Sequence, residues 1–289
     1  MGEISEALKR ARDGVRREAP PTPVVTSARR ETQTTNLAPA RDAASAVTIS
    51  DQSDGAWSAR AVLVAPRGEF AEGYRHFALR LQRQLKETGA RSVIVTSAAR
   101  GEGKTTTACN LALALASMSS GRRIALAELD VRRPSAARSL GITPAVGIER
   151  VLSGVARLAD ACIHTQLPEL DLYLANQPAR DPLRVVAAAS TGELLRDLAR
   201  QYDLVVIDSP PVLPVPDVPL LAAHADAVLL VARNGVSRRA ALRETIDSLD
   251  RDKLIGVFLN EGKTPRHRRY YGYYGYEETA QSPSEGKDQ

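Results

Sequence analysis

The sequence contains few cysteines and few aromatic residues. Cys109 and Cys162 are the only cysteines among 289 residues, and their spacing is not that of a metal-binding pair. Nothing in this pattern indicates the disulfide framework of a small secreted domain. Aromatic residues make up 4% of the chain and apolar residues 43%, so the core is predicted to be built mainly from aliphatic side chains.

Long apolar runs and a large net charge are also missing. No run reaches the roughly 18–20 apolar residues of a membrane-spanning helix, and the N-terminus carries no apolar signal-peptide segment. The formal net charge of +5 is small for this length and does not favour nucleic acid as a partner. We therefore expect a soluble, cytoplasmic protein that does not bind nucleic acid.

The composition divides the chain into four segments. Residues 1–17 carry apolar residues at helical spacing, which predicts an amphipathic helix that docks on its own domain, frays in solution or docks on a partner. Residues 18–60 are rich in Pro, Thr, Ser, Ala and Arg and are predicted to be a disordered linker. Residues 61–264 are predicted to form the globular domain, and a flexible, tyrosine-rich tail is predicted at residues 265–289.

Apolar segments and helical segments alternate in the predicted domain. Strands are predicted at residues 92–97, 123–129, 204–208, 227–231 and 254–260, with a further candidate at 170–175. Helices are predicted between them, for example at residues 69–86 and 238–249. Strand segments that are nearly all apolar and separated by helices indicate a parallel sheet that is buried on both faces. The predicted fold class is therefore α/β, with a doubly wound, mostly parallel sheet.

A phosphate-binding loop follows the first predicted strand, which makes the fold one of the phosphate-loop NTPase type. The loop reads Ala98-x-x-x-x-Gly103-Lys104-Thr105, with alanine in place of the usual first glycine. Gly101 and Gly103 let the backbone turn its N–H groups towards a phosphate. Lys104 is expected to reach the β- and γ-phosphates of ATP, and Thr105 to bind Mg²⁺. The expected nucleotide contacts in the loop are Arg100, Gly101, Glu102, Gly103, Lys104, Thr105 and Thr106.

Polar side chains follow several predicted strands. Glu128 and Asp130 are two residues apart, so on a strand they share one face and can approach a metal and an attacking hydroxyl. Asp208 ends an apolar strand in the manner of a Walker B acid, which binds Mg²⁺ directly or through water. Asn260 ends the last strand and either contacts the adenine edge or begins a turn. The predicted catalytic residues are Lys104, Glu128, Asp130 and Asp208, and the predicted metal ligands are Thr105, Asp130 and Asp208.

Five of the eight tyrosines cluster near the C-terminus. They are Tyr270, Tyr271, Tyr273, Tyr274 and Tyr276. Two glycines interrupt the cluster, and a polar segment follows it, so the tyrosines are not expected to pack in a core. The cluster is either a low-complexity segment or a mobile set of phosphate acceptors.

With these motifs the chain resembles the bacterial tyrosine autokinases (BY-kinases) of capsular and exopolysaccharide synthesis and export. The resemblance covers about residues 61–276 and is carried by residues 101–105, 130–134 and 202–211, by Asp217 and by the tyrosine cluster. It implies an ATP- and Mg²⁺-dependent protein-tyrosine autokinase that phosphorylates the cluster in trans and thereby regulates polysaccharide production. In that family the positions of Lys104, Thr105 and Asp208 hold ATP·Mg²⁺, and those of Glu128 and Asp130 assist the metal and activate the tyrosine hydroxyl.

The resemblance also implies partners. Family members form homo-oligomeric rings, and a membrane-embedded polysaccharide co-polymerase of the chain-length-determinant type activates them; a cognate tyrosine phosphatase is a further expected partner. Because the chain lacks a membrane helix, it resembles the split form of the family. It is then expected to be cytoplasmic and peripheral to the inner membrane through its partner.

Two positions depart from the family pattern. Glu128 stands where the family usually has aspartate, and the additional methylene can shift the metal or base geometry. In the oligomerisation helix Glu72 and Arg75 match, but Ala78 replaces the second arginine and Arg80 lies two residues further on.

Two alternative functions remain open from the sequence. One is a non-catalytic, nucleotide-gated scaffold in which the change at Glu128 has removed phosphoryl transfer. The other is a positioning ATPase of the cell-division or plasmid-partition type (MinD/ParA-like), although the position of its signature lysine is occupied here by Ala99.

Overall fold

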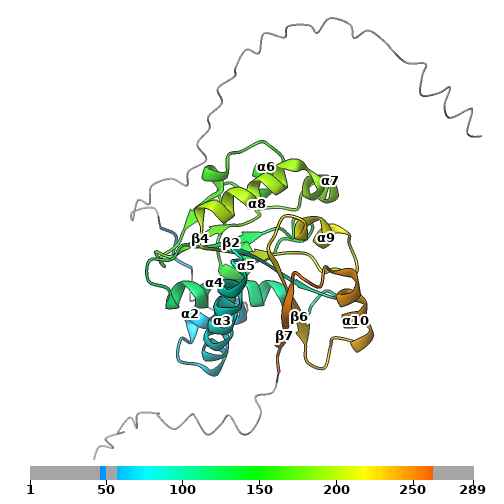
Figure 1. The fold of residues 1–289 in the computed structure, drawn as a ribbon. Coiled ribbons are helices and arrows are strands. Elements are labelled where there is room, and N and C mark those ends of the chain that lie inside the picture. The colour runs from blue at the N-terminus through cyan, green and yellow to red at the C-terminus, as the bar shows by residue number, and fades with distance from the viewer. Residues whose placement is uncertain (1–45, 50–56, 263–289) are drawn as a thin grey trace, which may run out of the picture. The chain divides into compact units, whose positions relative to one another are not determined.

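The computed structural model describes residues 46–49 and 57–262, and within them seven strands form one sheet (Figure 1). The strands are β1 Ser92–Ser97, β2 Ile124–Glu128, β3 Ile163–His164, β4 Leu170–Tyr173, β5 Leu204–Asp208, β6 Ala227–Arg233 and β7 Leu254–Asn260. Their order across the sheet is β3-β4-β2-β5-β1-β6-β7. All neighbours pair in parallel except β3 with β4. The predicted doubly wound α/β fold is confirmed; β3 was not predicted, because two residues are too short to show a periodic pattern.

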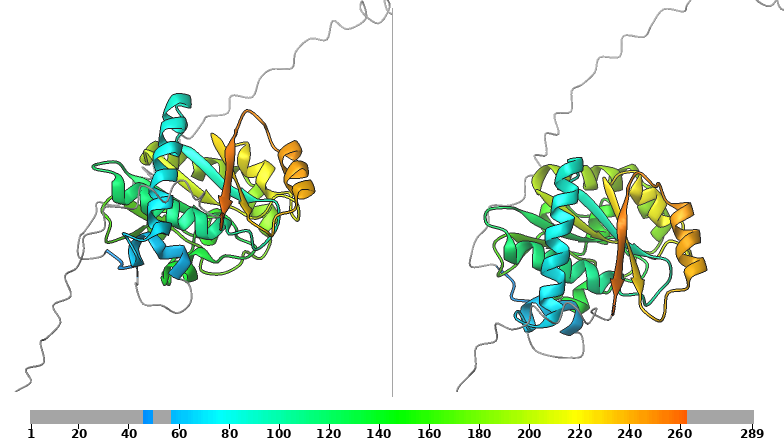
Figure 2. Two further views of the ribbon diagram at one scale, coloured as in Figure 1. Left: turned by 90° about the horizontal axis from the view of Figure 1, so that it is seen from below. Right: turned by 60° about the horizontal axis from the view of Figure 1, so that its bottom comes forward.

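Helices cover both faces of this sheet (Figures 1 and 2). The helices are α2 Ala61–Val64, α3 Glu69–Thr88, α4 Lys104–Met118, α5 Ala136–Leu140, α6 Ile148–Leu152, α7 Pro182–Ala187, α8 Ala189–Gln201, α9 Asp217–Ala222 and α10 Arg239–Ser248, with 3₁₀ turns η2 Trp57–Arg60 and η3 Leu158–Ala161. Buried residues of α3, α4 and α5 form one core with one face of the sheet, and those of α6 to α9 form a second core with the other face. None of the described helices has both the length and the apolar composition needed to cross a bilayer.

The apolar run in β1 shows why the sheet is buried on both sides. Val93 and Val95 belong to the core beneath α3 and α4, whereas Ile94 belongs to the opposite core, and all three are fully buried. Successive side chains of a strand point to opposite faces, so a strand covered on both faces has apolar residues that face either side, as Val93, Ile94 and Val95 do. The phosphate-binding loop follows the carboxyl end of this strand, which is packed on both faces.

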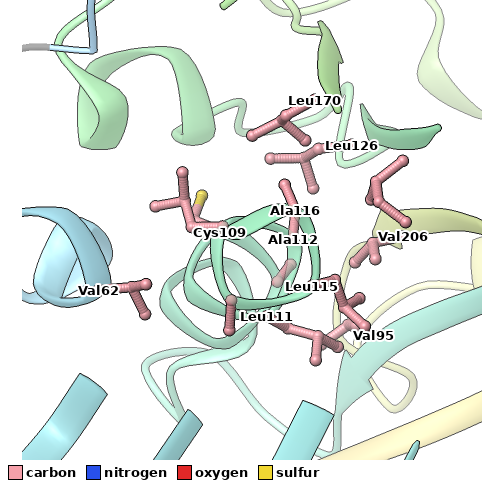
Figure 3. Close-up of a cluster of buried hydrophobic side chains, with 14 of the residues drawn as sticks. Val62, Val95, Cys109, Leu111, Ala112, Leu115, Ala116, Leu126, Leu170 and Val206 are labelled. Atoms are coloured by element: carbon pink, nitrogen blue, oxygen red, sulfur yellow. The ribbon is translucent and has the colours of Figure 1, made fainter. Parts of the chain in front are cut away.

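The helix that follows the loop, α4, is buried around its whole circumference from Thr107 to Ala116. Figure 3 shows it between Val62 on one side and the sheet residues Val95 and Val206 on another. Its one buried amide side chain, Asn110, accepts from the Val62 N–H at 3.2 Å and donates to the Thr106 carbonyl at 3.0 Å. A helix packed on all sides holds its own N-terminus, and therefore the loop, in one position.

Two stretches of the predicted linker lie against the domain. The Val47 N–H donates to the His164 carbonyl at 2.7 Å, and Ile49 is 2% exposed. Residues 57–60 form η2, in which Ala59 is also buried. The rest of the linker, the predicted helix at residues 1–17 and the tail at residues 265–289 lie outside the described residues.

Candidate functional site

The carboxyl ends of three central strands meet at the phosphate-binding loop. β5 lies between β1 and β2, so Asp208 is opposite Val95 of β1 on one side and opposite Glu128 of β2 on the other. β1 lies between β5 and β6, so β2, which carries Glu128, is separated from the loop strand by β5. Asp208 is therefore the acid beside the loop, while Asp130 lies beyond the end of β2.

Two glycines in left-handed conformations shape the loop. Gly101 has φ 78° and Gly103 has φ 93°, and α4 begins at Lys104 directly after them. A Cβ atom built on Gly103 would lie 2.0 Å from Nδ2 of Asn260, which itself donates to the Glu102 carbonyl at 3.2 Å. Only glycine fits here, because both the backbone angle and the approach of Asn260 exclude a side chain.

Gly103→Ala is expected to weaken nucleotide binding. The substitution strains the backbone by roughly 1–2 kcal/mol and pushes Asn260 away from the loop. Gly121→Ala is the matched control, since Gly121 has φ 78° but open space around its Cβ position. Calorimetric titration with a non-hydrolysable ATP analogue should show weaker binding for Gly103→Ala only; equal affinities for both variants would contradict the assigned role of Gly103.

Lys104 lies among carboxylates. Its Nζ is 2.9 Å from Oδ2 of Asp130, and the two side chains are 14% and 6% exposed. Burial opposes the charged ammonium, but the carboxylates of Asp208 and Asp130 outweigh that effect and raise the pKa of Lys104. The lysine is therefore held protonated and positioned at the start of α4.

Asp208 is the group that fits a metal ion best. It is fully buried, and neither carboxylate oxygen has a hydrogen-bond partner among the described residues. Burial raises the pKa of Asp208 to about 7; the charge of Lys104 opposes this rise and that of Glu128 adds to it. An unpartnered buried carboxylate beside a phosphate-binding loop matches the oxygen ligands that Mg²⁺ prefers. Asp208 and Thr105 therefore fit the predicted metal site.

The buried Asp208 predicts a pH dependence of stability in the metal-free protein. Its folded pKa of about 7 lies above the ordinary value of 3.8, so between these values the folded chain retains a proton that the unfolded chain releases. Stability contributed by this group is complete below about pH 4 and is lost as the pH rises through 7, at up to about 1.4 kcal/mol per pH unit.

Asp208→Asn should remove this loss and make the metal-free protein more stable than wild type at pH 8. Urea denaturation in EDTA from pH 5 to 8 measures the difference in unfolding free energy between the two proteins. A difference that does not grow with pH would show that Asp208 is not a buried, unpaired acid.

Glu128 makes contacts different from those expected of a catalytic acid. Its Oε1 accepts from the N–H groups of Ser135 and Ala136 at 2.5 and 2.7 Å, and its Oε2 accepts from that of Ala175 at 3.0 Å. Burial raises the pKa of Glu128, and these backbone bonds oppose the rise. Both carboxylate oxygens of Glu128 therefore accept hydrogen bonds from the backbone. These bonds connect the start of α5, at Ser135 and Ala136, with the segment after β4, at Ala175. This fits a residue that positions the loop between Asp130 and α5.

Asp217, one of the residues that carry the resemblance to the tyrosine autokinases, forms an ion pair with Arg132. Arg132 donates from Nε and Nη2 to the two oxygens of Asp217 at 2.7 and 2.8 Å. Asp217 is fully buried and is the first residue of α9. A paired, bidentate contact of this kind is among the stronger ones in proteins. It connects the loop that carries Asp130 with the N-terminus of α9.

Three contacts that support the loop were not predicted. Arg233, at the end of β6, donates to the Gly101 carbonyl at 3.1 Å. The buried Glu102 accepts from the Ala99 N–H at 2.8 Å and also from the Ser237 hydroxyl, so its side chain stabilises the loop by hydrogen bonds to two other positions. Part of the arrangement could be read from the sequence, because Arg233 lies two residues beyond the strand predicted at residues 227–231.

A further unpredicted hydroxyl lies at the metal side of the site. Ser135 Oγ is 3.3 Å from Thr105 Oγ1. Ser135 follows the Asp-x-Arg-Arg-Pro segment, but no spacing rule assigned it a role. Its place beside the predicted metal ligand Thr105 makes it part of the candidate site.

A cavity of about 510 Å³ adjoins the loop on the Asn260 side. It is lined by Ala61, Phe70, Tyr74, Gly101, Gly103, Thr106, Arg233, Asn260 and Glu261. Its place next to the loop suits the nucleoside part of a nucleotide. Both ends of the Asn260 amide already have partners, because Nδ2 donates to the Glu102 carbonyl and Oδ1 accepts from the Glu261 N–H at 3.0 Å. The structure therefore shows the turn contact of Asn260, and its contact with adenine stays a prediction. Arg100 is exposed, and the five clustered tyrosines lie outside the described residues.

A family model described as "AAA domain" matches residues 90–251, which is more than half of the chain. The chain belongs to this family. The matched residues of this AAA domain include the loop, Asp130 and Asp208, so the geometry described above lies within the shared part.

Named relatives place this AAA domain among the bacterial tyrosine kinases, as the sequence motifs indicated. The VpsO kinase domain is 32% identical, with a TM-score of 0.60, covering 68% of this chain and all of that one. "Tyrosine-protein kinase YwqD" of Bacillus subtilis is 29% identical over 74% of this chain and 90% of its own length. "Succinoglycan biosynthesis transport protein ExoP" of Rhizobium meliloti is 29% identical over 76% of this chain, but the match spans only 30% of ExoP.

Proposed function

We propose that this chain is an ATP-dependent protein-tyrosine autokinase that regulates the synthesis and export of extracellular polysaccharide. The acceptors are Tyr270, Tyr271, Tyr273, Tyr274 and Tyr276. The observation that carries the proposal is the buried carboxylate of Asp208, which has no described hydrogen-bond partner and lies beside a phosphate-binding loop. The names of the relatives supply the acceptor class and the link to polysaccharide.

The residues of the site have separate tasks in this reaction. The loop N–H groups and Lys104 hold the phosphates of ATP, and Thr105 and Asp208 hold Mg²⁺, with Asp130 nearby. The metal, when bound, neutralises negative charge on the phosphates. Lys104 neutralises the charge that develops on the bridging oxygen as the γ-phosphoryl group leaves.

Asp130 is the proposed acceptor of the tyrosine proton. In the structure described above its carboxylate is paired with Lys104 at 2.9 Å. Phosphate oxygens compete for the same ammonium group, so ATP binding draws Lys104 from Asp130 and leaves that carboxylate free. A free tyrosine hydroxyl has a pKa of about 10 and benefits from a nearby base during transfer.

Asp130→Asn tests this assignment, because it separates binding from chemistry. The amide keeps the size of the side chain but no longer holds Lys104 by charge, so the affinity for ATP·Mg²⁺ should be unchanged or higher. Phosphotyrosine formation should fall by about 10²-fold or more. Asp247→Asn, an exposed acid that pairs with Arg251 on the surface, is the control and should change neither value.

The two outcomes have different meanings. Normal phosphorylation by Asp130→Asn would eliminate it as the base. Loss of nucleotide binding together with activity would instead make Asp130 a binding residue, as a metal ligand would be.

We also propose a homo-oligomer and a membrane-embedded co-polymerase as partners, with a tyrosine phosphatase acting on the product and ATP and Mg²⁺ as cofactors. The chain would then act in the cytoplasm, at the inner membrane through its partner. Within one chain Arg75 pairs with Glu72 at 2.5 Å, and Ala78 is fully buried. A ring contact of the family type would thus rely on Glu72 and Arg75 exchanging partners between subunits, because Ala78 contributes no charge.

A further inference from the structure

A second cluster of polar side chains lies at the opposite end of the sheet from the phosphate-binding loop. Cys162 follows η3, His164 is on β3, and Asp171 is opposite His164 on β4. Asp171 is the second residue of β4, and β4 runs parallel to β2, so the cluster lies near the starting ends of the strands. The catalytic residues proposed above lie beyond the carboxyl ends, so this cluster has no part in that site.

The potential ligand atoms of the three residues converge. One ligand atom from each lies within 4.8 Å of the other two. Cys162 Sγ is 3.8 Å from His164 Nδ1, which is 2.8 Å from Asp171 Oδ1. A tetrahedral Zn²⁺ with ligands at about 2.0–2.3 Å places neighbouring ligand atoms about 3.3–3.6 Å apart. The Sγ–Nδ1 separation is slightly above this range and the Nδ1–Oδ1 separation is below it, so the ion would replace the His164–Asp171 hydrogen bond and move these two atoms apart.

Neighbouring residues orient the Asp171 carboxylate through its second oxygen, Oδ2. The Tyr202 hydroxyl donates to Asp171 Oδ2 at 2.9 Å and lies 2.9 Å from the Tyr173 hydroxyl. Arg123 Nη2 is 3.5 Å from the same Oδ2. Oδ1 is thereby directed to the side of His164 and Cys162. Metal-binding carboxylates in proteins are commonly held in this way by hydrogen bonds from a second layer of residues.

We propose that Cys162, His164 and Asp171 bind a Zn²⁺ ion, with a water molecule as the fourth ligand. A thiolate, an imidazole and a carboxylate form a ligand set that suits Zn²⁺ and not Mg²⁺ or Ca²⁺, which prefer oxygen ligands alone. Asp171 is fully buried, while Cys162 and His164 are partly exposed, so the ion can enter and the water can bind from their side. The two anionic side chains balance the charge of the ion.

The ion would stabilise β3, the edge strand that forms hydrogen bonds with residues 46–49. The His164 carbonyl accepts from the Val47 N–H at 2.7 Å, and the Val47 carbonyl accepts from the Gln166 N–H at 3.2 Å. A two-residue edge strand has few bonds of its own, so a metal bridge from β3 to β4 would hold it in place. Zn²⁺ should therefore slow hydrogen exchange at the amides of Val47 and Gln166.

The test uses the full chain, stripped with EDTA and kept in excess Mg²⁺ so that the catalytic site does not take up Zn²⁺. Titration with Zn²⁺, with bound metal measured after dialysis, should give one tight site per chain. Cys162→Ala and His164→Ala should each weaken binding by at least about 10-fold. The matched controls Cys109→Ala and His76→Ala, which change the buried cysteine of α4 and an exposed histidine of α3, should leave the affinity unchanged.

The cobalt spectrum of the wild-type chain tests the site without any substitution. Co²⁺ bound to the wild-type chain should give the near-ultraviolet absorption band of a thiolate–cobalt bond, and Zn²⁺ should displace it. The absence of this band in the wild type, or a band that persists in Cys162→Ala, would overturn the proposal. So would wild-type Zn²⁺ affinity in both ligand variants, in which case the three residues form only a hydrogen-bonded group.

Discussion

Lys104→Met is expected to reduce ATP-dependent tyrosine phosphorylation by at least about 10²–10³-fold. The lysine supplies the charge that stabilises the leaving phosphate, and methionine keeps its length without that charge. Phosphotyrosine formed per minute by the purified variant, relative to wild type, measures the loss. Unchanged phosphorylation would mean that the phosphate-binding loop is not the site of the reaction.

The same substitution should also lower stability. The loop pattern alone predicts an exposed lysine that contributes little to folding, but the Lys104 side chain is 14% exposed and ion-paired with Asp130. Removing it leaves Asp130 and the buried Asp208 without a cation, at a cost of about 1–3 kcal/mol. Lys253→Met is the control, because Lys253 is also partly buried and donates to the carbonyls of Ala222 and Ala225. It should lower stability but leave phosphorylation unchanged.

Replacing the five clustered tyrosines with phenylalanine should remove most autophosphorylation and leave nucleotide binding unchanged. The residues changed are Tyr270, Tyr271, Tyr273, Tyr274 and Tyr276. All five follow the last core strand, β7, which ends at Asn260, and none belongs to the loop or the acidic group. Phosphate incorporation and the affinity for an ATP analogue, measured on the same preparation, separate the two effects. Full incorporation in this variant would show that the acceptors lie elsewhere.

A mixture of two chains, one without the catalytic lysine and one without the acceptor tyrosines, tests transfer between molecules. A Lys104→Met chain retains the tyrosines, and the five-phenylalanine chain retains the loop. If the acceptors reach a neighbour's site, mixing the chains with ATP·Mg²⁺ should place phosphate on the Lys104→Met chain, favoured by the high local concentration within an oligomer. No label on that chain would indicate transfer within one molecule.

The sheet and the loop could be predicted from the sequence because short-range rules specify them. Segments with several consecutive β-branched apolar residues, such as residues 93–95, are typical of strands that are covered on both faces of the sheet. The loop pattern requires glycine where the backbone is left-handed, and Gly101 and Gly103 are both left-handed. Asp208 was assigned correctly to the end of a strand at the loop.

The contacts between segments could not be predicted in the same way. Arg132 and Asp217 are 85 residues apart, and no local rule pairs them. The backbone bonds of Glu128 depend on where β4 and α5 lie, so the sequence suggested only a carboxylate near the metal. Strand order decided which acid lies beside β1, and order follows from the packing of the whole domain. The remaining site assignments, including those of Arg100 and the tyrosine cluster, stay predictions.

Mapping of phosphate on the purified wild-type chain after addition of ATP·Mg²⁺ tests the central proposal most directly. Mass spectrometry should find the label on the tyrosines of residues 270–276. The tyrosines of the described domain, Tyr74, Tyr173 and Tyr202, are 6%, 0% and 2% exposed and should remain unmodified. A chain that binds ATP but acquires no phosphotyrosine would contradict the kinase account and identify a nucleotide-gated scaffold; label mainly on the three buried tyrosines would contradict the acceptor assignment.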